Sequence, residues 1–227
     1  MYDFHDPSLV QRWTLAGIGA IWLALAWWLL VGGGLFVVGG WFGKPPQPGD
    51  AIRRAVLAAA LSIYYIRILF TEFVFLKRGV RWSEVFTIAS WLLVIYVLLA
   101  FSGGLNPRGF GIVEAVGLIL FISGSWANSY AEFQRDRWKL RPENRGRLYT
   151  QGLFHYTRHP NYLGDLVSFS GLSMISGAWL CGLIPAIMFL GFVFVNIPML
   201  DGHLHGKYGA VFDEYASTTA KLIPYVY

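Results

Sequence analysis

The sequence predicts an all-α fold, a polytopic bundle of about six transmembrane helices. Of its 227 residues, 56% are hydrophobic and only 14% are charged, whereas about a quarter are charged in ordinary soluble domains. Apolar runs of about 20 residues recur along the chain, and each is long enough to cross a bilayer core of about 30 Å as a helix. These observations exclude a soluble globular protein, and the length suits a single membrane domain over residues 1–227.

The first apolar run, residues 14–42, is too long and too rich in Gly and Trp for the core of a signal peptide. We expect it to be a retained membrane helix. Its glycines at 32–34 and 39–40 lie within the apolar run, not between a strand and a helix, which indicates helix packing rather than a nucleotide-binding loop. A loop with three prolines follows at residues 43–50. Further spans are expected at residues 52–76, 84–101, 111–130, 162–180 and 181–200, the last two as a tight hairpin.

Several kinds of site are not expected. Cys181 is the single cysteine, which excludes a disulfide framework and a thiolate zinc site. His203 and His205 follow Asp201, but two histidines separated by one residue diverge on a helix, so the sequence predicts no metal site. The basic residues lie at the ends of apolar segments and not on one solvated face, so no nucleic-acid binding is expected. Nothing in the sequence indicates an obligate protein partner.

The distribution of Lys and Arg predicts that both termini lie in the cytoplasm. Short cytoplasmic loops carry an excess of these cations. With the N-terminus inside, thirteen of the 18 cations lie on the inner side, seven of them in the polar stretch 131–160, and Arg67 lies within a span. Four lie on the outer side: Lys44, Arg53, Arg54 and Arg108.

Polar residues recur at helical spacing where the fourth span runs into the cytoplasm. Asn128, Glu132, Arg135 and Lys139 are spaced i, i+4, i+7 and i+11, which places them on one face of a helix. One interpretation is a solvated, salt-bridged helix end. The other is a functional site, because Asn128 and Glu132 lie close to an apolar span, where an unpaired carboxylate is costly and usually functional. The stripe leads into a loop whose cations suit a ligand with several phosphates: Arg141, Arg145 and Arg147.

A second polar string, GLFHYTRHPNYLGD, occupies residues 152–165 at the start of the fifth span. Pro160 fixes the chain where a helix can begin, and Asn161 and Asp165 then fall in its first turns. Asp165 could accept hydrogen bonds from an amide or a ribose hydroxyl while Arg158 binds an anionic group. The alternative is an interfacial helix start, with an aspartate that favours the helix dipole and a tyrosine in the aromatic belt.

Together with the tail, these motifs resemble the C-terminal half of the steroid 5α-reductase and sterol reductase superfamily. The similarity covers residues 124–227 and is carried by Asn128 with Glu132, RHPNYLGD at 158–165, KYG at 207–209, FDEY at 212–215 and the ending IPYVY. Isoprenylcysteine and phospholipid methyltransferases share the helical architecture and a similar Arg-His-Pro-x-Tyr string. Asn161, Asp165 and the KYG motif favour the reductases.

The resemblance implies an integral membrane oxidoreductase that binds NADPH in a cytoplasmic-side cavity and reduces a carbon–carbon double bond of a lipid-like substrate, such as an enone. It implies that helices of residues 111–227 bind the cofactor and helices of residues 1–110 bind the substrate. The implied cofactor contacts are Asn128, Glu132, Arg135, Lys139, Arg158, His159, Asn161, Tyr162, Asp165 and Tyr208.

On the substrate side, the steroid reductases hold the substrate carbonyl with a tyrosine of the second span and an acidic or amide residue of an earlier helix. Tyr64 and Tyr65 stand in the corresponding region here, whereas the first span has no carboxylate or amide. Glu72 follows Tyr65 by seven residues, on nearly the same helical face, and we expect it to replace the missing group. Tyr65, Tyr64 and Glu72 are therefore the candidate catalytic residues.

Two other functions remain open. An S-adenosylmethionine-dependent methyltransferase of the isoprenylcysteine or phospholipid type would bind a cofactor that also contains an adenosine. A non-enzymatic membrane scaffold or transporter would also place charges within a span. The expected partners of the chain are a lipid-like small molecule and membrane lipids.

Overall fold

The structure is a computed structural model that describes residues 7–43 and 47–227. Lys44, one of the outer cations, and the first two prolines of loop 43–50 lie outside the described residues. Every regular element in the described residues is helical, and an isolated β-bridge joins Thr157 to Ala220. The predicted all-α fold is confirmed. The helices are α1 (Leu9–Leu30), α2 (Gly34–Trp41), α3 (Ala51–Phe70), α4 (Trp82–Gly104), α5 (Ile112–Lys139), α6 (Pro160–Ser176), α7 (Leu183–Gly191), α8 (Ile197–Tyr208) and α9 (Ala210–Thr218).

The described residues contain five helical segments that are long and apolar enough to cross a membrane. The predicted fifth span becomes α6, which has 17 residues and is shorter than the roughly 20 needed to cross the bilayer core upright. The chain is therefore an integral membrane protein with a bundle close to the predicted one. The five segments are Leu9–Leu30, Ala51–Phe75, Trp82–Gly104, Ile112–Lys139 and Trp179–Tyr208.

The first predicted span is wrong in its extent. Instead of one helix over residues 14–42, α1 ends at Leu30 and the short helix α2 begins at Gly34. Gly33 between them has a φ of 80°, a left-handed conformation that glycine adopts without steric cost. Gly33, which we expected to pack helices, thus breaks the helix, because a left-handed residue cannot continue a right-handed one. Gly39 and Gly40 lie within α2.

The fourth predicted span continues into the polar stretch, as its stripe of polar residues indicated. α5 extends from Ile112 to Lys139, so its last turns carry the polar side chains that follow the apolar part. α3 likewise continues as a π-helical turn at Thr71–Phe75. At the other end of α3, the Asp50 side chain accepts a hydrogen bond from Arg53 N at 2.8 Å and so caps the first turn.

The chain forms two compact units. Unit 1 comprises Met1–Phe121 and Phe169–Ile184, and unit 2 comprises Ile122–Ser168 and Pro185–Tyr227. The division falls within α5 and α6, so each of these helices contributes to both units.

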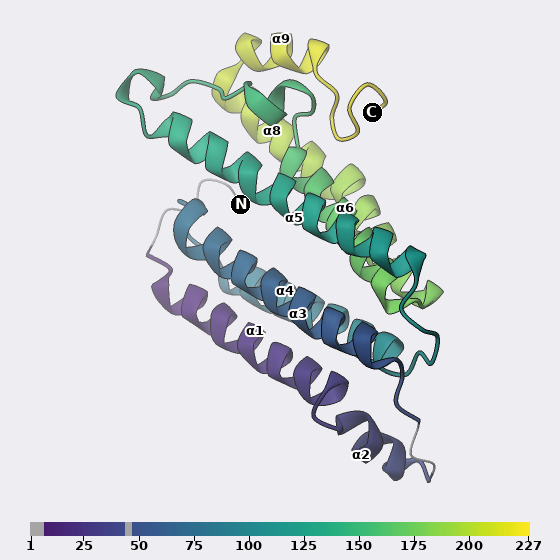
Figure 1. Ribbon diagram of the computed structural model, residues 1–227. Helices are drawn as coiled ribbons and strands as arrows, with labels where there is room; N and C mark the ends of the chain where they lie inside the picture. The colour runs from purple at the N-terminus through teal and green to yellow at the C-terminus, as the bar shows by residue number, and fades with distance from the viewer. Residues whose placement is uncertain (1–6, 44–46) are drawn as a thin grey trace. The chain divides into compact units, whose positions relative to one another are not determined.

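In unit 1, α1, α3 and α4 run side by side (Figure 1). Their inner faces carry aliphatic side chains that are completely buried, among them Leu57, Leu61, Ile95 and Leu99. Burial of each such side chain favours folding by about 1.5–3 kcal/mol relative to exposure in water. In a bilayer the gain comes instead from close packing, because lipid is itself apolar.

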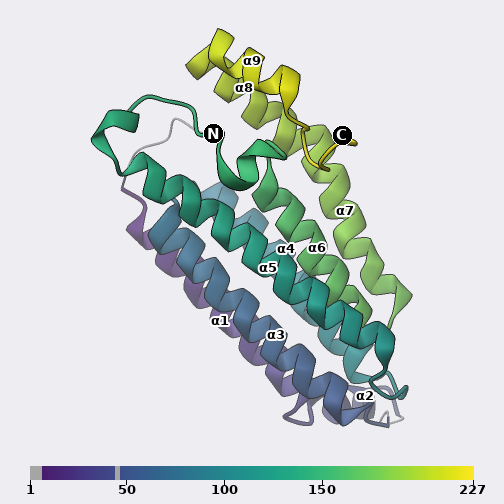
Figure 2. The ribbon, with the colours of Figure 1, turned by 45° about the horizontal axis from the view of Figure 1, so that its top comes forward.

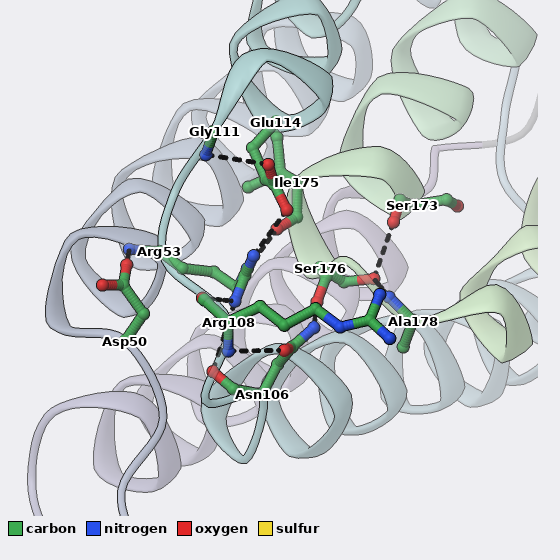
Figure 3. Close-up of polar contacts among 10 residues, drawn as sticks. All are labelled: Asp50, Arg53, Asn106, Arg108, Gly111, Glu114, Ser173, Ile175, Ser176 and Ala178. Carbon is green, nitrogen blue, oxygen red and sulfur yellow. Dashed lines mark hydrogen bonds and ion pairs between the residues drawn. The ribbon is translucent and has the colours of Figure 1, made fainter.

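A buried arginine joins three parts of unit 1 (Figure 3). Arg53 is 0% exposed. Its Nε donates to the Ile175 carbonyl at the end of α6, at 3.0 Å, and its Nη1 donates to the Asn106 and Arg108 carbonyls at 3.2 and 2.5 Å. Its Nη2 forms an ion pair with Glu114 Oε1 at 2.5 Å.

Each guanidinium nitrogen of Arg53 therefore has an acceptor. The other Glu114 oxygen accepts a hydrogen bond from Gly111 N at 2.9 Å, so both charges of the pair are satisfied. Such an arrangement offsets the large cost of removing two ions from water. It also means that Arg53, counted above as an outer cation, is neutralised by a carboxylate instead of lying free in a loop.

In unit 2, the end of α5 packs against the start of α6 (Figure 2). Glycines permit this contact, since a Cβ at Gly124 would lie 2.5 Å from Ser168 N and 2.8 Å from Ser168 Oγ. The chain between the two helices folds back onto α5, where Tyr149 and Phe154 pack against Ala131. These contacts place the RHPN segment, residues 158–161, beside the polar stripe of α5.

Candidate functional site

A polar cluster links α5 to the first residues of α6. Asn128 Nδ2 donates to the Asn161 carbonyl at 2.9 Å, and Asn161 Nδ2 donates to Glu132 Oε1 at 3.0 Å. Asn128 and Glu132 are buried. Gly164 makes this approach possible, because a Cβ there would lie 2.6 Å from Asn128 N. We call Asn128, Glu132 and Asn161 the amide–carboxylate cluster.

The second carboxylate oxygen of Glu132 forms an ion pair with Arg135, one turn further along α5. The structure thus contains a salt bridge of the kind that a solvated, salt-bridged helix end predicts. Its carboxylate is nevertheless buried and shared with Asn161, which a solvated helix end does not require. Glu132 is therefore a buried charge whose two oxygens are held by groups from α5 and from the start of α6.

Arg158 and His159 converge on one carboxylate, that of Asp201 on α8. Arg158 Nη2 donates to Asp201 Oδ2 at 2.8 Å, and His159 Nε2 lies 3.0 Å from Asp201 Oδ1. Since a carboxylate only accepts, His159 Nε2 carries a proton in this contact. Arg158 Nη1 also donates to the Ala216 carbonyl of α9 at 3.0 Å. Arg158 Nε is buried, and no described residue provides a hydrogen-bond partner for it.

Three nearly parallel rings continue from His159. The rings of His159 and Tyr162 are 5.3 Å apart with an interplanar angle of 10°, and those of Tyr162 and Phe192 are 4.5 Å apart with an angle of 9°. These ring contacts connect the start of α6 to Phe192, which lies in the segment before α8.

The C-terminal tail is bound to the segment before α6. Arg158 N donates to the Ala220 carbonyl at 2.8 Å, and Thr157 Oγ1 donates to the Leu222 carbonyl at 2.9 Å. Tyr215 OH donates to the Phe154 carbonyl at 2.5 Å. Burial raises the pKa of Tyr215, so this hydroxyl keeps its proton and continues to donate at neutral pH.

Three further predicted cofactor residues lie on helices that contribute to unit 2: Asp165, Lys139 and Tyr208. Asp165 is half-buried on α6, one turn after Asn161. Lys139 ends α5 and Tyr208 ends α8, where the Lys207 ammonium lies 5.5 Å from the Tyr208 ring centroid. The Lys139 ammonium interacts electrostatically with the Glu132 carboxylate of the amide–carboxylate cluster, and also with Arg135 and Lys207. The loop arginines proposed for phosphate binding are exposed: Arg141, Arg145 and Arg147.

Unit 1 holds the candidate catalytic residues. Tyr65 OH donates to the Ala16 carbonyl of α1 at 2.8 Å, so its proton is already engaged. Tyr64 is buried, and its ring makes edge contacts with the rings of Tyr96 and Phe169 at 6.4 and 5.0 Å. The Arg67 guanidinium lies 5.0 Å from the Tyr64 ring centroid. Tyr64 thus belongs to an aromatic group inside unit 1, whereas Tyr65 faces α1.

Glu72 lies on the π-helical turn that ends α3. It is buried, and its Oε2 has no hydrogen-bond partner in the described part of the chain, while Arg12 donates to its backbone carbonyl. The extra residue in a π-helical turn changes the angular phase, so the seven-residue spacing does not by itself put Glu72 on the face of Tyr65.

Sequence reasoning missed two polar groups. Tyr96 on α4 is completely buried, and its hydroxyl has no hydrogen-bond partner within residues 7–43 and 47–227. A tyrosine within an apolar span does not indicate this in the sequence. Asp201 entered only as a possible metal ligand beside His203, and the described residues contain no group of three His, Cys, Asp or Glu suited to a metal ion. Its pairing with Arg158 and His159 spans more than forty positions of sequence.

Unit 2 also contains a surface cavity of about 490 Å³, lined by the turn before residue 158, α9 and the tail. Its wall includes His155, Tyr156, Glu214 and Tyr215. None of the predicted cofactor residues lines it. We therefore do not include the cavity in the candidate cofactor site.

Comparison with known proteins gives relatives of two kinds. "Probable O-methyltransferase ustE" of Ustilaginoidea virens is 38% identical over 89 residues, which are 38% of this chain and 31% of the relative. "3-oxo-5-alpha-steroid 4-dehydrogenase 2" of Homo sapiens is 25% identical over 113 residues, 50% of this chain and 42% of the relative. The Mus musculus protein of the same name is 23% identical over 233 aligned positions, 100% of this chain and 87% of the relative.

The chain thus spans less than half the length of the first two relatives. A model of the family described as "Protein of unknown function (DUF1295)" matches residues 80–219, which include the amide–carboxylate cluster, Arg158, His159 and Asp201. The match covers more than half of the chain. The chain therefore belongs to the DUF1295 family, which is part of the steroid 5α-reductase superfamily that its motifs resemble.

Proposed function

We propose that this protein is a membrane reductase that uses NADPH to reduce a carbon–carbon double bond, such as that of an enone, in a lipid-like substrate. The amide–carboxylate cluster carries the proposal. It combines a buried carboxylate with amide groups from two helices, where the superfamily resemblance implies cofactor contacts. The steroid dehydrogenase relatives support the same reaction class.

The residues present fit a phosphorylated dinucleotide. Arg158 Nε is a buried donor without a partner, and an unsatisfied buried donor is favourable only when a ligand or water completes it. Asn161 and Asp165 offer hydrogen bonds to an amide or to ribose hydroxyls. The exposed loop arginines Arg141, Arg145 and Arg147 suit phosphate groups.

When bound, such a dinucleotide supplies the hydride that adds to the β-carbon of the double bond, while a proton adds to the α-carbon. The contribution of this chain is to bind the substrate oxygen and polarise the bond. Within unit 1 we assign this role to Tyr64 and Tyr96, because the Tyr96 hydroxyl is buried without a partner. Tyr65 donates to Ala16 instead and serves the packing of α1 on α3.

The proposal is tested by cofactor binding to the purified protein in lipid nanodiscs. We expect NADPH to bind at least about tenfold more tightly than NADH, a difference of about 1.4 kcal/mol, because the 2′-phosphate adds a charge-assisted contact. Equal affinity for the two dinucleotides would contradict this part. Tight binding of S-adenosylmethionine with neither dinucleotide would reject the reductase.

A second candidate is an S-adenosylmethionine-dependent methyltransferase. It is favoured by the 38% identity to the probable O-methyltransferase. S-adenosylmethionine has no phosphate, so replacing the exposed loop arginines by alanine would leave its affinity unchanged, while NADPH affinity would fall. The same variants therefore distinguish the two candidates.

The cytoplasmic location of both termini stays a prediction. It rests on the excess of Lys and Arg on the inner side of the predicted spans. A reporter fused after Tyr227 should be active in the cytoplasm. Activity on the opposite side alone would overturn the orientation.

A further inference from the structure

The RHPN segment, residues 158–161, is held from two sides. On one side Asp201 binds Arg158 and His159. On the other side Asn161 bonds to Asn128 and Glu132. Pro160 separates His159 from Asn161 and restricts the backbone between them. A displacement of His159 is therefore transmitted directly to Asn161.

Arg158 is committed to the protein, although its residue type suggests phosphate binding. It is only 7% exposed, and both terminal nitrogens are engaged, with Asp201 and with the Ala216 carbonyl. Its guanidinium also lies 5.8 Å from the Phe212 ring centroid. Swinging the side chain outward would leave the Asp201 carboxylate without its ion-pair partner in a largely buried position, which is costly.

We propose that Asp201 is a positioning residue that, through Arg158 and His159, fixes Asn161 within the amide–carboxylate cluster. Arg158 then acts as a clamp between α8, α9 and the start of α6, and offers a ligand only its Nε. Only the identity of the ligand rests on the proposed function. The contacts of Arg158 with Asp201 and Ala216 are a property of the folded chain.

Asp201→Asn tests the negative charge of Asp201 while nearly preserving the shape of the side chain. The asparagine fills the same space but removes the negative charge, and its amide nitrogen cannot accept from Arg158 or His159. One buried cation then lacks its counterion. We expect the RHPN segment and the tail to loosen while the rest of the chain stays folded.

The chain offers a matched control. His205 Nδ1 lies 2.7 Å from Asp213 Oδ1, and both side chains are exposed. This pair joins the same residue types as His159 and Asp201, through the other ring nitrogen and without burial. Asp213→Asn should therefore change little, because exposed ion pairs contribute weakly.

The experiment is hydrogen exchange followed by mass spectrometry on the full chain in nanodiscs, with NADPH binding measured on the same samples. In Asp201→Asn, amide exchange in residues 157–163 and 216–222 should rise at least about tenfold, with α3 and α4 unchanged. NADPH affinity should fall at least about tenfold, which is about 1.4 kcal/mol. Asp201→Glu, which keeps the charge, should recover at least part of both losses. Asp213→Asn should match the wild type.

Unchanged protection and affinity in Asp201→Asn would overturn the proposal, as would an equal effect of Asp213→Asn or a failure of Asp201→Glu to recover either loss. If the wild-type protein binds no dinucleotide, the proposed function fails and the exchange data alone decide the role of Asp201. Should Asp201→Asn not fold, isotope-labelled histidine in the wild-type protein provides the test by NMR. The His159 proton must reside on Nε2, and a neutral ring protonated on Nδ1 alone would refute the contact.

Discussion

Arg53 in unit 1 and Arg158 in unit 2 are both buried arginines that tie helix ends together. Arg53 satisfies all its guanidinium nitrogens with three carbonyls and Glu114. Arg158 satisfies two of its nitrogens with Asp201 and Ala216 and leaves Nε buried without a partner. The difference shows that burial of a charge does not by itself indicate a binding site.

What distinguishes the two is the presence of spare hydrogen-bonding capacity. A fully satisfied buried ion pair such as Arg53 with Glu114 needs no ligand to offset its burial. A buried donor without a partner is expensive and indicates a group that is completed from outside the protein. By this criterion the Arg53 cluster is structural, whereas the surroundings of Arg158 are a candidate site.

The largest expected effect lies in the structural cluster. Arg53→Met leaves Glu114 buried without its cation, so the free energy of unfolding should fall by about 3–5 kcal/mol, as when one partner of a buried pair is removed. Thermal or denaturant unfolding of the protein in detergent measures this. NADPH affinity of the fraction that remains folded should be unchanged.

Arg108→Ala is the matched control for Arg53. The Arg108 side chain is exposed and only its carbonyl contacts Arg53, so the change should stay within about 0.5 kcal/mol. If Arg108→Ala were as damaging as Arg53→Met, or if Arg53→Met weakened NADPH binding specifically, the assignment of this cluster as structural would be wrong.

The next effect lies in the candidate site. Asn161→Ala removes the donor to Glu132 Oε1, and Asp165→Ala removes a carboxylate one turn further along α6. Each should weaken NADPH binding by about 1–3 kcal/mol, the cost of leaving a buried polar partner unpaired. Titration of NADPH into the purified variants measures it. Normal affinity in both variants would remove the amide–carboxylate cluster from the site.

Substitutions of the residues assigned to the substrate should lower turnover and leave cofactor affinity unchanged. Groups that interact more strongly in the transition state lower turnover without weakening ground-state binding. Tyr64→Phe and Tyr96→Phe should therefore slow reduction at unchanged NADPH affinity, with enone reduction in nanodiscs as the assay. Tyr65→Phe loses the bond to Ala16 and should cost about 1 kcal/mol of stability but little turnover.

The opposite result for the tyrosines would also be informative. If Tyr65→Phe slowed the reaction and Tyr64→Phe did not, the Tyr65 hydroxyl would have to leave Ala16 when substrate binds. If neither tyrosine, nor Tyr96, nor Glu72 mattered, the account of substrate polarisation would be wrong while the cofactor site could stand.

Much of this arrangement is accessible from the sequence because it depends on local periodicity. The polar stripe of α5 predicted that the helix continues to Lys139, and Pro160 predicted the start of α6. The break at Gly33 was missed, since an apolar run containing glycines does not reveal which glycine adopts a positive φ.

Contacts between distant segments were not predictable in the same way. The bond from Asn161 to Glu132 depends on the close approach of two helices, which Gly124 and Gly164 permit. Asp201 binds residues more than forty positions earlier, and no local pattern encodes that pairing. The motifs therefore predicted most of the candidate residues around the start of α6. They did not predict the role of Asp201, which binds Arg158 and His159.

The smallest expected effect concerns arginines of a third kind, whose side chains are exposed. Arg141, Arg145 and Arg147 are exposed, and a contact from an exposed cation contributes about 0.2–1 kcal/mol. Arg145→Ala should therefore lower NADPH affinity by at most about fivefold and leave NADH affinity unchanged. Raising the salt concentration should shrink the difference between variant and wild type, because an exposed charge is screened within about 8 Å at physiological ionic strength. An equal loss for NADH, or a loss that salt does not diminish, would show that Arg145 acts through the fold of its loop and not through the 2′-phosphate.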